Sequence, residues 1–161
     1  MALLGKARTA TGAGVIASVL LVLFFGNQAF TEWVARHTTS NDVWGFFLRT
    51  LTWPAWAFGP RDSSTAAMRD LLAQDLRAIL LIVFCALVLG ISAKSASGGG
   101  AFVLGWAALI FGSALAAFLA AFLATNSTWL GALGAASVAS AYGLFVGWIV
   151  GAAVATVKGG G

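Results

Sequence analysis

The residues best suited to chemistry in this chain are His37, Arg49, Arg61 and Asp62. A histidine combined with a carboxylate and arginines is a set that can support acid–base chemistry when the side chains meet. All four lie in a polar connection, Thr31 to Arg77, which also holds all five acidic residues of the protein. An enzyme is therefore expected only if these four side chains converge in one pocket outside the membrane.

The apolar segments supply hydroxyl groups but no acid or base. Ser113, Ser137, Ser140 and Tyr142 lie in these segments, and none of the four long apolar runs contains Asp, Glu, Lys, Arg or His. A serine nucleophile needs a neighbouring base, and transporters and proton relays are marked by ionisable groups within the membrane. The sequence therefore predicts a protein that is not an enzyme. The four hydroxyl residues define an alternative, a small pore or carrier for a neutral or apolar solute.

Metal and cofactor binding find no support in the residue types. The chain has one histidine and one cysteine, Cys85, and its five carboxylates are dispersed without a recognisable ligand spacing. No cofactor and no metal are expected.

The overall composition places these residues in a membrane protein. Of 161 residues, 60% are hydrophobic and only 9% are charged, and the mean hydropathy is +0.95. In soluble domains, roughly a quarter of the residues are charged. The net charge of +4 comes from scattered basic residues, whereas nucleic-acid-binding proteins cluster them on one face, so no nucleic-acid partner is expected.

The apolar runs predict an all-α integral membrane protein with four transmembrane helices in a single domain, residues 1–161. A spanning helix needs roughly 20 apolar residues. The expected spans are 12–30, 76–93, 101–124 and 130–151. The second consists of the apolar run 78–93 extended by Leu76 and a snorkelling Arg77, and it continues a helix capped by Asp62 or Ser63. A long polar and amphipathic loop, 31–75, separates the first two spans. A cleaved signal peptide is the rival interpretation of the first run, although Gly26 to Ala29 is a poor cleavage site.

An amphipathic helix is expected inside this loop. Asn41 and Asp42 are suited to cap it, and an apolar stripe recurs at helical spacing until Pro54. The stripe and the aromatic segment after it form either an interfacial segment that closes over the bundle or a docking face for a partner. The expected contact residues are Trp44, Phe47, Leu51, Trp53 and Trp56.

Small residues at four-residue spacing predict close helix packing in the last two spans. Gly143, Gly147 and Gly151 form a groove, because large residues fill the positions between them. The third span repeats the spacing with Ala108, Gly112 and Ala116. A short turn makes the last two spans an antiparallel hairpin, so their faces of small residues are expected to pack against each other.

The leading functional hypothesis is a non-enzymatic membrane protein that acts through helix packing, as a homo-oligomer or as an accessory subunit of a complex. Its expected partners are the lipid bilayer and either itself or other membrane proteins. Composition favours a bacterial plasma membrane. Cytoplasmic termini would place Lys6, Arg8, Lys94 and Lys158 inside, whereas the arginines of the long loop argue for the opposite orientation.

Overall fold

The computed structural model describes residues 9–39, 41–60, 62–92, 96–124 and 128–159, and most of the part of the chain that it describes is helical. Within that part there is no strand, only an isolated bridge between Asn27 and Trp56. The helices are α2 (Ala10–Phe25), α3 (Gln28–His37), α4 (Val43–Leu51), α5 (Thr65–Ser92), α6 (Gly98–Ala121) and α7 (Trp129–Gly159).

Three of these helices are long and apolar enough to cross a membrane. They are α5, α6 and α7, with 28, 24 and 31 residues. At 1.5 Å per residue each exceeds the roughly 30 Å of a bilayer hydrocarbon core. The predicted class of an all-helical membrane protein is confirmed to this extent, with the three helices close to the expected ranges.

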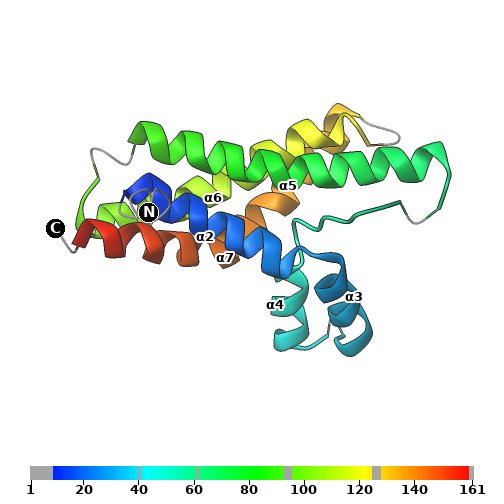
Figure 1. Cartoon of the computed structure of the whole chain (residues 1–161), viewed down its shortest axis with the longest axis horizontal. Coiled ribbons are helices and arrows are strands. Elements are labelled where there is room, and N and C mark those ends of the chain that lie inside the picture. Colours follow the sequence, from blue (N-terminus) through cyan, green and yellow to red (C-terminus); the bar gives the residue numbers. More distant parts are fainter. Residues whose placement is uncertain (1–8, 40, 61, 93–95, 125–127, 160–161) are drawn as a thin grey trace.

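The long helices lie side by side. Figure 1 shows α2, α5, α6 and α7 running along the long axis of the molecule, with α3 and α4 turned across it. The start of α2 and the end of α7 lie at the same end, where a Cβ on Gly14 would be 3.0 Å from Val154. The outward faces carry large apolar side chains, such as Ile79 and Val83 on α5 and Phe111 on α6.

The contact between α6 and α7 is made through glycine. A Cβ added to Gly147 would lie 2.5 Å from the Trp106 ring, and one added to Gly151 would lie 2.6 Å from the Phe102 carbonyl oxygen. At Gly143 it would lie 2.7 Å from the backbone nitrogen of Ile110. No real Cβ approaches other atoms this closely, so the two backbones touch only because side chains are missing there.

The opposite face of α6 packs on α5 in a similar way. A Cβ on Gly112 would lie 3.2 Å from the backbone nitrogen of Cys85. Ala108 and Ala116, one turn to either side, are fully buried. The structure therefore places both sets of small residues between helices of this one chain, with α6 in the middle.

The helix expected to run without interruption over 12–30 instead ends at Phe25. Asn27 interrupts it: its side-chain amide donates to the Phe24 carbonyl (2.6 Å) and its oxygen accepts from the Phe30 backbone (2.9 Å), which caps α3. The Trp56 backbone N–H donates to the Gly26 carbonyl (2.8 Å). These contacts leave α2 with 16 residues, about 24 Å at the standard rise.

The expected loop 31–75 is also largely helical. It contains most of α3, all of α4 and the first turns of α5. The Asp42 cap of α4 is confirmed, since its carboxylate accepts from the Gly45 backbone (2.6 Å). At the start of α5 the Ser64 hydroxyl accepts from Ala67 (3.1 Å), so Ser64 takes the capping role expected of Asp62 or Ser63.

Substituting Gly143 by Ala should destabilise the bundle. The new methyl group would meet the Ile110 backbone, which cannot rotate away, so α7 must shift from α6. Overpacking of this kind costs about 1–3 kcal/mol. The measurement is the free energy of unfolding in a denaturing-detergent titration.

The matched control is Gly134→Ala on the same helix, where a Cβ meets nothing within 4 Å. It should leave the stability unchanged or raise it by up to about 1 kcal/mol, because alanine favours helix. Equal destabilisation by both variants would contradict the close packing of α6 on α7 at Gly143.

Candidate functional site

The side chains that could have formed an outer enzyme site do not converge. His37 stacks on Trp33 with ring centroids 5.0 Å apart, and its Nδ1 lies 2.9 Å from the Trp33 carbonyl oxygen. Arg49 donates to the Thr38 carbonyl (2.6 Å), and Asp62 accepts from the Ser64 backbone (2.8 Å). Asp62 lines a polar cavity that neither His37 nor Arg49 lines. Arg61 lies outside the described residues.

The hydroxyl residues of the apolar helices do not line one path either. The buried Ser113 hydroxyl donates to the carbonyls of Ile110 (2.9 Å) and Ala139 (2.8 Å), so it joins α6 to α7. Ser137 and Ser140 donate to backbone carbonyls of their own helix, and Tyr142 is buried against Trp53. A pore or carrier would need a different set of residues for its path.

Functional geometry is concentrated where α2 stops, beside the middle of α7. The α3–α4 hairpin, residues 28–51, projects from the side of the bundle there, with its helices turned across the long axis (Figure 1). Its two helices pack through the buried Val34 of α3 and the buried Leu48 of α4. Arg49 ties the helices together through its bond to Thr38, the residue that ends α3.

The segment after α4 is pinned to three long helices. The Trp56 indole N–H donates to the Val22 carbonyl of α2 (3.0 Å), and the Ala57 backbone donates to Asp75 of α5 (3.1 Å). Trp53 packs on Tyr142 of α7, with ring centroids 5.0 Å apart. These contacts fix where the hairpin meets the bundle.

Arg77 of α5 supports the same junction. Its guanidinium carbon lies 4.9 Å from the centroid of the Trp53 ring, within the range of a cation–π interaction. Its Nε atom is buried and makes no hydrogen bond to the described residues. The ring of Trp53 is therefore held between a cation on α5 and an aromatic side chain on α7.

The five residues expected to form an outer contact therefore differ in burial and in their contacts within the chain. Leu51 is buried, and Trp53 and Trp56 make contacts within the chain. Phe47 is partly buried and stacks on Trp44, with ring centroids 6.0 Å apart. Only Trp44 of the expected set is strongly exposed.

The sequence analysis missed two residues that share this exposure. Val43 is 88% exposed, Trp44 64% and Phe46 50%. We call these three residues the aromatic edge of α4. The helical spacing pointed to Trp44 but not to Val43 and Phe46, because these two residues are not at the positions of the apolar stripe.

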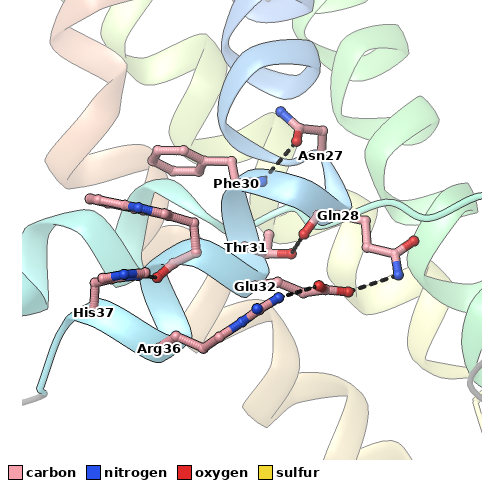
Figure 2. Close-up of polar contacts among 8 residues, drawn as sticks. Asn27, Gln28, Phe30, Thr31, Glu32, Arg36 and His37 are labelled. Atoms are coloured by element: carbon pink, nitrogen blue, oxygen red, sulfur yellow. Dashed lines mark hydrogen bonds and ion pairs between the residues drawn. The ribbon is translucent and has the colours of Figure 1, made fainter.

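A polar cavity of about 490 Å³ lies between α3, the segment 56–64 and the first turns of α5. Its polar lining includes Gln28, Thr31, Glu32, Asp62, Ser64, Asp70 and Gln74, and Trp56 contributes an aromatic wall. Figure 2 shows Glu32 on α3, held by Gln28 (2.9 Å) and by the ion pair with Arg36 (2.8 Å). Its charge is therefore already balanced.

The pKa of the Asp62 carboxyl, which lines this cavity, is lowered by hydrogen bonding. Hydrogen bonds from the Ser64 side chain and the Ser64 backbone lower the pKa of its carboxyl below the usual value. The stabilisation from this turn is complete above the ordinary aspartate pKa and is lost as the pH falls through the lowered one.

Within the described ranges, no group of three or more His, Cys, Asp or Glu side chains could hold a metal ion.

An apolar groove of about 290 Å³ lies between α4 and α7. We call it the α4–α7 groove, and its lining residues are Phe46, Arg49, Thr50, Trp53, Val138, Ala141, Tyr142 and Phe145. Phe46 closes against Phe145 edge to face, with ring centroids 5.5 Å apart. The groove thus combines apolar walls with a single charged side chain, Arg49.

Comparison with protein-family models, with curated proteins and with solved structures gives no match to this chain.

Replacing Trp56 by Phe should loosen the junction between the hairpin and α2. Phenylalanine keeps most of the ring but loses the indole hydrogen bond to the Val22 carbonyl. A net loss of about 0.5–1.5 kcal/mol is typical of one hydrogen bond. Thermal unfolding in detergent would measure it.

Trp44→Phe is the matched control, because Trp44 is on the exposed edge of α4. Its stability should stay within about 0.5 kcal/mol of the parent, as for surface substitutions in general. A larger effect at Trp44 than at Trp56 would show that the indole bond does not hold the junction.

Proposed function

We propose that this chain is a non-enzymatic, four-span membrane protein that serves as an accessory subunit and presents its α3–α4 hairpin to a partner protein. The observation that supports this best is the aromatic edge of α4. Val43, Trp44 and Phe46 are exposed, yet their helix is fixed to the bundle at its other end. A rigid support with an exposed aromatic edge suits recognition, because little freedom is lost on binding.

The proposal includes α2 as a fourth span. Its 16 residues cover about 24 Å, somewhat less than the hydrocarbon core. It packs along α5 and α7, and Leu20, Leu23 and Phe24 face outward as lipid-facing residues would. A short span is accommodated when the bilayer thins locally or flanking aromatic residues settle at the interface.

The close-packed glycines bear on how the protein associates. Gly143, Gly147 and Gly151 face α6 of the same chain, so a second chain cannot use them without opening the bundle. Association, whether with a second copy or with another protein, is therefore assigned to the outer surface. Among the exposed residues, the edge of α4 is set apart from the lipid-facing stripes because the hairpin lies across the bundle axis.

For orientation we propose cytoplasmic termini in a bacterial plasma membrane. Lys158 lies in the last turn of α7, at the same end as the start of α2. Lys6, Arg8 and Lys94, the other basic residues expected on this side, lie outside the described residues. The hairpin and the polar cavity would then lie at the outer surface.

Labelling of single cysteines should test this arrangement. Gly59 and Gly159 both have open space around them, so cysteine fits at either position, and the buried Cys85 should stay unlabelled. Gly59→Cys should react with a membrane-impermeant maleimide in intact cells. Gly159→Cys and an added N-terminal tag should become accessible only after permeabilisation. An N-terminal tag exposed in intact cells would contradict the fourth span.

Photo-crosslinking should test the partner surface. Benzoylphenylalanine in place of Trp44 should give a discrete adduct with a second protein, identified by mass spectrometry, because the edge of α4 is the assigned contact. The control position is Ile79, which is exposed on a lipid-facing stripe of α5. An adduct between two copies of the chain would assign the partner as the protein itself. Lipid adducts alone at both positions would refute the proposed function.

A further inference from the structure

The α4–α7 groove has walls that suit an acyl chain. Val138 is 66% exposed and Phe145 is 45% exposed, on a helix apolar enough to cross a membrane. The side chains across the groove include Phe46 of α4 and Trp53, which lies two residues after the end of that helix. At about 290 Å³ the groove is close to the smallest volume usual for ligand sites.

The charge in the groove is of one sign. Arg49 is the only charged residue that lines it, and no carboxylate lines it. The Arg49 guanidinium donates one N–H to the Thr38 carbonyl, a neutral acceptor. This hydrogen bond of 2.6 Å fixes the position of the guanidinium. A guanidinium has five N–H donors, so it can hold an anionic oxygen as well.

The lining of the groove fits an amphiphile. Its α7 residues, Val138 to Phe145, lie in the first half and middle of that helix, and Trp53, which follows α4, forms part of the opposite wall. Tryptophan is enriched at the level of lipid headgroups, and arginine binds phosphate through its forked N–H donors. The Arg49 side of the groove therefore suits a headgroup phosphate, and its α7 wall suits an acyl chain.

From these observations we infer that the α4–α7 groove binds one anionic phospholipid, with an acyl chain against Val138 and Phe145 and its phosphate on Arg49. A zwitterionic lipid offers the same phosphate, but the groove has no carboxylate to hold its amine. The site therefore selects a net negative headgroup. This inference does not require the partner protein proposed above, although Phe46 belongs both to the edge of α4 and to the wall of the groove.

The test is native mass spectrometry of the full chain in mild detergent. Phosphatidylglycerol and phosphatidylcholine with identical acyl chains are added in equal amounts. The parent protein should retain one phosphatidylglycerol in preference to phosphatidylcholine by about threefold to fivefold, because the choline cation repels the Arg49 guanidinium, whereas phosphatidylglycerol carries no cation. Arg49→Gln should reduce this preference to nearly one.

Two further variants separate the site from general lipid adhesion. Ala141→Trp, at an exposed position in the groove, should reduce the retention of both lipids because it fills the space for the acyl chain. Arg36→Gln removes an arginine that is exposed on α3 and paired with Glu32, and it should behave like the parent. Inorganic phosphate in excess should not displace the lipid.

Several results would overturn the inference. Equal retention of the two lipids by the parent would remove the selectivity, and equal losses in Arg49→Gln and Arg36→Gln would remove the site. Parent-like retention in Ala141→Trp would show lipid adhering elsewhere, and displacement by inorganic phosphate would show a site for a free anion. None of these results bears on whether the edge of α4 crosslinks to a protein.

Discussion

The close approach of α6 and α7 is the contact on which the rest of the structure depends. Within a membrane, apolar side chains gain little by leaving lipid for another helix, so close packing must come from surfaces without side chains in the way. Gly143, Gly147 and Gly151 provide such a surface against α6. Because Gly112 does the same for α5, the middle helix holds both neighbours at short range, and the outer faces remain free for lipid.

A second constraint is the early end of α2, which determines where the chain leaves the bundle. The break at Asn27 ends α2 early, and Trp56 then bonds to two carbonyls of the α2 end, at Val22 and Gly26. The hairpin must therefore leave the bundle beside α7 rather than continue along the axis. Both the polar cavity and the α4–α7 groove follow from this turn, since each has one wall on a long helix and another on the segment that the turn redirects.

Much of this fold could be predicted from local signals in the sequence. Length and hydropathy identify α5, α6 and α7, and an aspartate before an amphipathic stripe identifies the cap of α4. The break at Gly26 is only partly a local signal: Asn27 caps α3 next to it, but the bond that the Gly26 carbonyl accepts comes from Trp56, thirty residues later. For the same reason the aromatic residues of the loop looked equivalent, although Trp53 and Trp56 are held by α7 and α2 while Trp44 is left exposed.

The distribution of polar groups limits where the protein can act. The apolar runs 12–30, 78–93, 101–124 and 130–157 contain no Asp, Glu, Lys, Arg or His, and the Ser113 hydroxyl donates to two carbonyls, which joins α6 to α7. Apart from Lys158, the charged side chains of the described residues lie in the hairpin, in the segment after it and in the first half of α5. There α4 uses one face for packing through Leu48, another for the groove through Arg49, and a third for the exposed Trp44. The nine-residue helix α4 therefore presents separate side chains to the bundle, to the groove and to the exterior. Both proposed interactions, with a lipid and with a protein, involve this one helix.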